Sequence, residues 1–449
     1  MKLSWLAGSL LGAIPTLAIP TITAVGNKFF TSEGDQFFLK GTLPSYEFCP
    51  QSQARDSNFC TGIAYQLRPD DPLIDTEQCA RDAALMKTLG ANAIRVYHVD
   101  AKADHSGCMS EFAKAGIYAL IDMDTFNTYI LPNNPWWNET QYKAYAAVMD
   151  AFSDFDNTLG FFVGNEIIAI SNQSTAAPFI KAASRDLKAY RDKKGYRKFP
   201  VGYSATDIAE LRPMLQDYLT CGGNPADNVD FFALNSYEWC DPADYLNSGY
   251  QNLQSMAVDF PVPIFFSETG CNVPGPRLFD DQAAIFGPEM VNDWSGSIIY
   301  EWIEEANNYG LISYGPALNP TAVGEDIDDG FTRKGTPLPV SPDFNNLKSQ
   351  WAKITPTGVA SSEYTPKVST RKCPASTSGG WLLDGNVALP TIGETFSGSF
   401  SSAPTAAPSK TGGTAASPSS TKNPAPANKE IAGMSAGLVG VMLFFTFWL

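Results

Sequence analysis

The chain has 449 residues, with 47 Asp and Glu against 31 Lys and Arg and a net charge of −16. This acidic balance argues against a nucleic-acid partner, because nothing in it would neutralise phosphates. The only histidines are His98 and His105, so a zinc site would lack its usual ligands and a Ser-His-Asp hydrolase is disfavoured. Any catalysis therefore falls to carboxylates, without a metal or cofactor.

Residues 1–18 are typical of a secretory signal peptide. A lysine precedes an apolar run, Leu3 to Ile14, and a small-residue pattern ending at Ala18 follows it, with Ala24 as a second candidate for cleavage. A buried N-terminal helix is the alternative, but Pro15 would end such a helix directly after the apolar run. We therefore expect the chain to be secreted.

Between residues 25 and 373, short apolar runs alternate with helical patterns such as Glu77–Leu89 and Gln141–Phe152. This alternation predicts parallel strands joined by helical crossovers. The apolar runs are Ile94–Tyr97, Tyr118–Asp122, Gly160–Asn165, Val201–Tyr203, Phe231–Asn235, Ile264–Glu268 and Ser297–Trp302. An eighth strand near Phe37–Gly41 would close a (β/α)8 TIM barrel, an α/β fold that commonly needs this length.

Polar side chains stand where these runs end, at the rim on which (β/α)8 barrels build their active sites. They are Tyr97, Asp122, Asn165, Glu166, Asn235, Tyr237, Glu268 and Tyr300. A single carboxylate at a strand end can instead cap the next helix. Two carboxylates, Glu166 and Glu268 at the ends of the expected fourth and seventh strands, favour a catalytic pair.

Cleavage of a glycosidic bond with retention needs one carboxyl to protonate the leaving oxygen and another to attack the anomeric carbon. Glu166 follows the apolar residues 161–163, which should raise its pKa and suit it to be the acid. Asn165 beside it can bind the 2-hydroxyl of the sugar. Glu268 would be the nucleophile, oriented by Tyr237. Aromatic residues that could stack on sugar rings, unless they pack in the core, are Trp136, Trp137, Tyr300 and Trp302.

Cysteines and sequons add to the expectation of secretion. Eight cysteines, at positions 49, 60, 79, 108, 221, 240, 271 and 373, include no CxxC pair. An even count in a secreted chain predicts disulfides. Asn138 and Asn172 begin N-glycosylation sequons, which predict surface positions in a secreted chain.

The composition changes beyond the barrel. Residues 374–430 are rich in Ser, Thr, Ala, Pro and Gly, and predict a disordered, O-glycosylated stalk because they bury too little apolar surface to fold. Residues 431–449 form an apolar run after a polar spacer, which is typical of a GPI-attachment signal with its attachment residue between Ser419 and Asn428. A tail-anchored transmembrane helix is the alternative.

Several stretches between residues 64 and 310 form a specific set. They are Ala64–Gln66, Asp71–Asp75, Cys79–Asp82, Ile94–Tyr97, Gly164–Glu166, Tyr203–Ser204, Phe265–Glu268, Gly270–Cys271, Trp294–Gly296 and Glu304–Gly310. The chain resembles, in these stretches, the fungal β-1,3-glucanosyltransferases of glycoside hydrolase family 72, the GPI-anchored Gas, Gel and Phr group. The pair on strands four and seven is also similar to the wider clan of (β/α)8 retaining glycosidases.

The resemblance implies a transfer reaction. The family cuts an internal β-1,3-glucan bond, holds the new reducing end as a covalent glycosyl-enzyme, and passes it to the non-reducing end of another glucan. A monomer held by a GPI anchor on the outer face of the plasma membrane and acting in the cell wall is implied. By motif, Glu166 is the acid/base and Glu268 the nucleophile.

The resemblance also implies substrate-binding residues. Those on the donor side are Tyr97, Asn165, Tyr237 and Tyr300. Further positions that match the cleft or hold sugar are Gln66, Asp122, Asp207, Arg212 and the loop Asp124–Pro132, with its Asp124 and Asn127. Three disulfides follow from the same resemblance, namely Cys79–Cys108, Cys240–Cys271 and Cys221–Cys373.

The chain departs from the family pattern in a few places. Thr269 stands where Tyr is usual, and Glu301-Trp302 replaces a more usual Met-Tyr. These changes are expected to alter sugar affinity or the balance between transfer and hydrolysis. Only Cys373 follows Cys271, which places the chain in the shorter subgroup without the Cys-rich carbohydrate-binding module.

Residues 42–62 interrupt the expected first strand. In the family, a Lys-Gly pair leads almost directly into the Ala-Tyr-Gln motif, whereas here a polar stretch containing Cys49 and Cys60 separates the two. We hypothesise that this stretch is a retained intron, because removing it restores a continuous apolar strand from Phe37 to Tyr65. A real loop closed by a disulfide between the two cysteines is the alternative.

Two other functions stay open at this point. A β-glucan endohydrolase would share the fold, the site and the covalent intermediate, and would differ only in using water as the acceptor. A non-catalytic glucan-binding wall protein is the other alternative, and the intact carboxylate pair argues against it.

Overall fold

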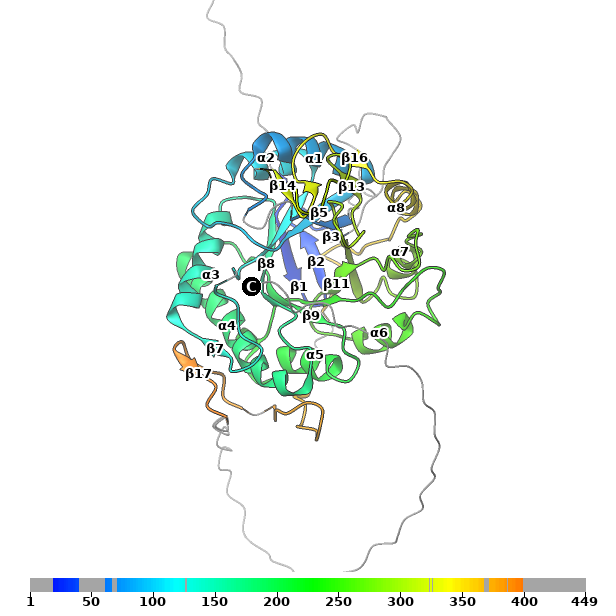
Figure 1. Cartoon of the computed structure of the whole chain (residues 1–449). Coiled ribbons are helices and arrows are strands. Elements are labelled where there is room, and N and C mark those ends of the chain that lie inside the picture. Colours follow the sequence, from blue (N-terminus) through cyan, green and yellow to red (C-terminus); the bar gives the residue numbers. More distant parts are fainter. Residues whose placement is uncertain are drawn as a thin grey trace, which may run out of the picture. The chain divides into compact units, whose positions relative to one another are not determined.

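The computed structural model contains a closed barrel surrounded by helices (Figure 1). The structure describes residues 19–39, 61–66, 71–125, 127–322, 324, 326–366, 371–385 and 387–398. The expected signal peptide, most of the stretch 42–62, the stalk beyond residue 398 and the apolar tail lie outside these residues. Within them, no helix has both the length and the apolar character needed to span a membrane.

Eight parallel strands close the barrel in the order β10-β11-β12-β4-β5-β6-β8-β9. They are β4 Thr61–Ala64, β5 Ala91–Val96, β6 Tyr118–Asp122, β8 Thr158–Asn165, β9 Val201–Thr206, β10 Phe232–Asn235, β11 Ile264–Thr269 and β12 Trp294–Ile299. Helices cover their outer face and side chains fill the interior, which explains the continuous apolar runs. The predicted (β/α)8 fold is confirmed, with β8 and β11 as its fourth and seventh strands.

Helices lie around the barrel between the strands (Figure 1). They are α1 Thr76–Leu89, α2 Ser106–Ala115, α3 Glu139–Phe152, α4 Ala177–Lys194, α5 Arg212–Thr220, α6 Tyr250–Ala257, α7 Asp281–Ile285, α8 Asp343–Trp351, and the 3-10 turns η1 Ser171–Ala176 and η2 Pro225–Asp227. Their ends follow local sequence: α1 begins where the Asp75 carboxylate accepts the Gln78 N–H, and ends at Gly90 with φ 98°. The two helices named from sequence correspond to α1 and α3.

The predicted barrel strand Phe37–Gly41 is correct only in part: Leu39 bridges Gly296 of the barrel in parallel fashion, Phe37 pairs with Phe29 of a separate sheet, and residues 40 and 41 lie outside the described residues. The residues before it form an antiparallel sheet of β1 Ile22–Val25, β2 Lys28–Thr31 and β3 Gln36–Phe37. Phe29 of this sheet packs against Phe265 inside the barrel, with ring centroids 6.0 Å apart. The Tyr118 hydroxyl, at the start of β6, donates to the Pro20 carbonyl at 2.5 Å. The sheet therefore covers the N-terminal end of the barrel, opposite the catalytic rim, and β4 supplies the eighth strand.

The C-terminal segment, which we define as residues 371–398, is folded, so the predicted end of the folded domain at residue 373 is wrong. Trp381 and Leu383 are buried in the main core. A short strand, β17 Glu394–Thr395, pairs with β7 Trp136–Trp137 (Figure 1). The small-residue composition averages out these few large apolar side chains, and for this reason it predicted disorder too early.

Three disulfides match the pairs that the family resemblance implied. They are Cys79–Cys108, Cys221–Cys373 and Cys240–Cys271. Cys49 and Cys60 lie outside the described residues.

Beyond β12, two small antiparallel sheets consist of β13 Ile312–Ser313 with β16 Leu338–Pro339, and β14 Ile327–Asp328 with β15 Phe331–Thr332.

We propose that residues 42–62 are extraneous to the fold, and the strand register supports this. Leu39 bridges Gly296 of β12 in parallel fashion, and Ile63 of β4 pairs with Ile299. The partners of Leu39 and Ile63 on β12, Gly296 and Ile299, are therefore three residues apart. Without residues 42–62, three steps also separate Leu39 from Ile63 along the chain, and Gly41 takes the place of Gly62 opposite the residue before Ile299.

The alternation of buried faces agrees with this register. Leu39 and Ala64 belong to the cluster inside the barrel, whereas Phe38 and Ile63 belong to the cluster between strands and helices. In the shortened chain, the two members of each pair are four residues apart. Side chains alternate between the faces of a strand, so the members of each pair lie on the same face of a single strand.

A chain that lacks residues 42–62 should fold with a thermal midpoint equal to or above that of the full chain, because no long loop has to be closed within the strand. The matched control lacks residues 42–63, which shifts the register by one and turns every later side chain of β4 to the other face. A lower midpoint for the first deletion, or equal midpoints for both, would contradict the proposal.

A chain that ends at residue 373 should be less stable than one that ends at residue 398. Burial of the Trp381 and Leu383 side chains contributes about 1.5–3 kcal/mol each. We expect the thermal midpoint of the shorter chain to be lower by roughly 5 °C or more. Equal midpoints in differential scanning calorimetry would show that the C-terminal segment adds nothing to the fold.

Candidate active site

The C-terminal ends of the barrel strands border a cleft of about 360 Å³. Its lining comes from the ends of β5, β6 and β8 and from the loop after β6. The lining residues are Tyr97, His98, Asp122, Asp124, Tyr129, Ile130, Pro132, Asn165, Glu166 and Ile167. Parallel strands present their C-terminal ends on one face, so these residues meet although they are far apart in sequence.

Arg95 lies beneath the cleft with no exposed surface. Its guanidinium donates to both Asp122 oxygens at 3.0 and 2.7 Å, to the Asn165 side-chain oxygen at 3.0 Å and to Glu268 Oε1 at 3.2 Å. Burial opposes its charge, but the carboxylates of Asp122 and Glu268 outweigh burial and raise the pKa of the guanidinium. This role was not predicted from the sequence, although an arginine inside an apolar strand was a usable signal.

Glu268, on β11, is buried, and its carboxylate accepts hydrogen bonds from two tyrosine hydroxyls. Tyr97 donates to Oε1 and Tyr237 donates to Oε2, both at 2.9 Å. Burial is the main cause that raises the pKa of the Glu268 carboxyl to about 7, and the nearby Glu166 charge also raises it. The Arg95 charge and the hydrogen bonds from the two tyrosines lower this pKa. These donors all favour the ionised form, which is the form that a nucleophile needs.

Glu166 directly follows β8 and differs from Glu268 in its surroundings. Its backbone is left-handed, with φ 51°, a conformation that costs a non-glycine residue about 1–3 kcal/mol and concentrates at functional sites. Asn235 donates to its Oε1 at 2.9 Å. The side chain is exposed. The apolar surroundings predicted for it are therefore wrong, because residues 161–163 point into the core beneath it while the carboxyl faces the cleft.

Asn235, at the end of β10, connects the two halves of the site. Its Nδ2 donates to Glu166 and, at 3.0 Å, to the Asn165 side-chain oxygen. Ser204 and Ser267 donate to its Oδ1 at 2.9 and 2.8 Å. Arg95 and Asn235 both donate to the Asn165 side-chain oxygen, and these bonds fix the orientation of the Asn165 amide. Its Nδ2 group is left as the donor that the predicted bond to a sugar hydroxyl requires.

Three tyrosines pack together beside Glu268. The ring centroid of Tyr300 lies 6.4 Å from Tyr237 and 5.3 Å from Tyr309, and Tyr237 lies 5.6 Å from Tyr309. Tyr309 was not among the predicted site residues. The predicted stacking role is wrong for Trp137 and Trp302, which have no exposed surface, because aromatic side chains in these runs pack in the core.

The other predicted cleft residues have more varied positions. Gln66 accepts the backbone N–H groups of Tyr97 and His98, both at 3.1 Å, and so shapes the loop after β5. Burial, reinforced by the neighbouring carboxylate of Asp122, raises the pKa of Asp124 to about 7. Asn127 is exposed and is not among the residues that line the cleft. Their contacts with sugar stay predictions.

Asp207 and Arg212 form a buried ion pair at the end of β9. Ser236 donates to Asp207 at 2.6 Å, and it precedes Tyr237 in the chain. The pair therefore contacts the backbone region that carries Tyr237, and it is not among the residues that line the cleft. A direct contact of either residue with sugar stays a prediction.

Glu301 is a further carboxyl near the site. It follows Tyr300, is buried, and accepts from Asn307 at 2.8 Å. Burial, together with the charge of Glu305, raises its pKa to about 8. Sequence reasoning identified this position only as a departure from the family pattern.

Comparison with known proteins shows the family to which this chain belongs. A family model described as glucanosyltransferase, glycoside hydrolase family 72, matches residues 13–326. The chain belongs to this glucanosyltransferase family. The match covers every strand of the barrel and ends before the C-terminal segment.

Individual glucanosyltransferases are similar over most of this chain. The 1,3-beta-glucanosyltransferase PGA5 of Candida albicans is 38% identical over 77% of this chain and 52% of its own length. The 1,3-beta-glucanosyltransferase GAS2 of Saccharomyces cerevisiae is 37% identical over 83% of this chain and 63% of its own length. The chain spans 52% to 65% of the length of four of the curated relatives that it matches.

A solved glucanosyltransferase also matches the fold. Gas2p of Saccharomyces cerevisiae in complex with laminaritriose and laminaritetraose has a TM-score of 0.70 and 36% identity. The match covers 84% of this chain and 78% of that one.

Removing a hydroxyl donor from Glu268 should shift the acidic limb of the activity profile. Glu268 is the predicted nucleophile and must be ionised in that role, so we expect activity to fall as the pH drops through its pKa, about 7. Tyr237→Phe removes a bond that favours the ionised form, so this pKa rises and the limb of kcat/KM moves to higher pH.

Tyr309→Phe is the matched control, because Tyr309 packs against Tyr237 and Tyr300, whereas the donors to Glu268 are Tyr97, Tyr237 and Arg95. Its acidic limb should coincide with that of the unmodified chain. A limb that stays in place in Tyr237→Phe, or that moves equally in both variants, would contradict this account of Glu268.

Proposed function

We propose that this protein is a retaining β-1,3-glucanosyltransferase. One observation carries the proposal: two carboxylates at the ends of the fourth and seventh barrel strands have different surroundings that suit different roles. Glu166 is exposed to the cleft, whereas Glu268 is buried and accepts from Arg95, Tyr97 and Tyr237. Similarity to enzymes named 1,3-beta-glucanosyltransferase supports the same reaction.

In the first half-reaction, a Glu268 oxygen attacks the anomeric carbon of an internal glucose unit. The glycosidic bond breaks, and Glu166 gives its proton to the leaving oxygen, so the departing fragment gains a hydroxyl. The Asn165 amide, fixed by Arg95 and Asn235, is placed to bind the 2-hydroxyl of the sugar that becomes linked to Glu268.

In the second half-reaction, Glu166 is a carboxylate and acts as the base. It removes a proton from the hydroxyl at the non-reducing end of another glucan, whose oxygen attacks the anomeric carbon. The new β-1,3 bond forms as the bond to Glu268 breaks, and Glu268 leaves as a carboxylate. Arg95 and the two tyrosines stabilise that charge, which supports its role as a leaving group.

Donor and acceptor are both β-1,3-glucan chains in this proposal. Complexes of Gas2p, a relative with the same fold, contain laminari-oligosaccharides. We further propose that the protein is secreted, is held to the outer face of the plasma membrane by a GPI anchor, and acts as a monomer in the fungal cell wall. The sequence patterns at 1–18 and 431–449 support the first two points.

The second candidate is a β-glucan endohydrolase, which the same site favours equally, because water can replace the acceptor hydroxyl without any other change. Incubation with a reduced laminari-oligosaccharide separates the two functions. Transfer gives products longer than the substrate, whereas hydrolysis gives only shorter ones. Exclusively shorter products would overturn the proposed transferase.

Glu166→Gln and Glu268→Gln should each lower the initial rate of product formation by roughly 10²-fold or more, because a positioned proton donor or a covalent nucleophile is lost. The matched control is Glu139→Gln, an exposed residue of α3 that pairs with Lys143. It should retain the full rate. Unchanged glucan processing in either site variant would support a non-catalytic glucan-binding protein instead.

A further inference from the structure

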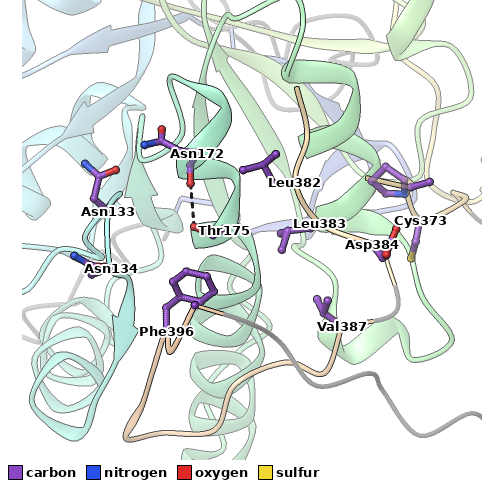
Figure 2. A pocket seen from close by; sticks show the side chains of 14 residues that line it. Asn133, Asn134, Asn172, Thr175, Cys373, Leu382, Leu383, Asp384, Val387 and Phe396 are labelled. Carbon is purple, nitrogen blue, oxygen red and sulfur yellow. Dashed lines mark hydrogen bonds between the residues drawn. The ribbon is translucent and has the colours of Figure 1, made fainter. Parts of the chain in front are cut away.

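A second cavity, with other lining residues than the catalytic cleft, is formed by the barrel and the C-terminal segment. It has a volume of about 900 Å³ and lies between the barrel and the C-terminal segment (Figure 2). Asn133 and Asn134 come from the loop after β6, Asn172 and Thr175 from η1, and the opposite wall from the C-terminal segment. The wall residues of that segment include Leu382, Leu383, Asp384, Val387 and Phe396.

The C-terminal segment is attached to the barrel on both sides of this cavity. Toward its start, Trp381 is buried, and the Leu382 N–H donates to the Ser174 hydroxyl at 3.0 Å. Toward its end, β17 pairs with β7, and the Phe396 N–H donates to the Pro135 carbonyl at 2.9 Å. The cavity thus spans the gap between two attachment points.

A glycosylation sequon forms part of the barrel-side rim. Asn172 is exposed, and its side-chain amide makes no hydrogen bond to another described residue. Ser174, the third residue of the sequon, is buried and bonds to the Ser171 carbonyl at 2.7 Å. Asn172 therefore belongs to the lining of the cavity (Figure 2), whereas Ser174 supports η1 through its bond to the Ser171 carbonyl.

The cavity walls suit a sugar. The side-chain amides of Asn133 and Asn134, like that of Asn172, have no hydrogen-bond partner among the described residues, so they can donate to and accept from hydroxyl groups. Phe396 offers a half-buried ring, against which the apolar face of a pyranose can pack. The volume is in the range of sites that enclose ligands of a few sugar units.

We propose that an N-linked glycan on Asn172 occupies this cavity and holds the C-terminal segment on the barrel. The inference rests on the secretion that is part of the proposed function, and not on glucan transfer. Covalent attachment at the rim gives the first sugar units a high effective concentration at the walls, so weak contacts with Asn133, Asn134 and Phe396 suffice to keep them there. The glycan would join the two attachment points of the segment.

The experiment compares the Asn172 glycan with one on Asn138, where the second sequon lies. Asn138 caps α3 through its side-chain oxygen, and it does not line the cavity. The secreted protein is treated with an endoglycosidase under native conditions, and glycopeptides are then quantified by mass spectrometry. We expect release at Asn172 to be about tenfold slower than at Asn138, because a glycan packed against the protein is accessible only when the segment opens.

A second measurement follows the C-terminal segment itself. Limited proteolysis within residues 371–398 should be about tenfold faster in Asn172→Gln than in the unmodified protein, since loss of the glycan raises the population of the open segment. Thr140→Ala, which removes the Asn138 sequon but keeps the Asn138 cap because that cap uses the Thr140 backbone N–H, is the matched control and should leave this rate unchanged. Both variants retain the catalytic residues.

An unmodified Asn172, or equal release rates at the two sequons, overturns the inference. So does equal proteolysis of the two variants. Retained glucan transfer alongside any of these results leaves the proposed function intact. Conversely, absence of transfer by a protein that shows the protected Asn172 glycan rejects the proposed function and leaves this inference standing.

Discussion

The buried charge of Arg95 is the constraint on which the site depends. A guanidinium without exposed surface needs partners for its donors, and Asp122, Asn165 and Glu268 supply them from three other barrel strands or their ends. Loss of one member of such a buried pair typically costs about 3–5 kcal/mol, because an unpaired charge stays behind. The same interaction therefore holds the strand ends in register and keeps a negative charge favourable on Glu268.

The two carboxylates differ because the barrel gives them different supports. Glu268 lies on β11 and is enclosed by donors, which suits an oxygen that must first attack and later leave as an anion. Glu166 follows β8 in a left-handed conformation that turns its carboxyl into the cleft, where it can reach a leaving oxygen, an acceptor hydroxyl or water. Asn235 contacts both Glu166 and Asn165, and so couples the acid to the group expected to bind the 2-hydroxyl.

Most of the barrel and the carboxylate pair could be predicted from sequence, because parallel strands read as apolar runs and their functional residues stand at the ends. The first strand could be predicted only in part, because Phe37 pairs with β2 whereas Leu39 bridges β12, and this division depends on non-local pairing. The Arg95 network was missed for a related reason: only the closed barrel brings its partners together. Composition gave the wrong prediction for the C-terminal segment, where a few large apolar side chains, Trp381 and Leu383, are buried within a stretch of small residues.

The central claim, that Glu268 is the nucleophile and Glu166 the acid/base of a retaining site, is tested most directly by chemical rescue. Glu268→Gly and Glu166→Ala are each given azide and a β-1,3-glucan oligomer with a good leaving group, and the configuration of the glycosyl azide is determined by NMR. The account predicts an α-azide from Glu268→Gly, because azide attacks from the face that the carboxylate left, and a β-azide from Glu166→Ala, because azide opens the covalent intermediate. The reverse assignment of products would contradict it.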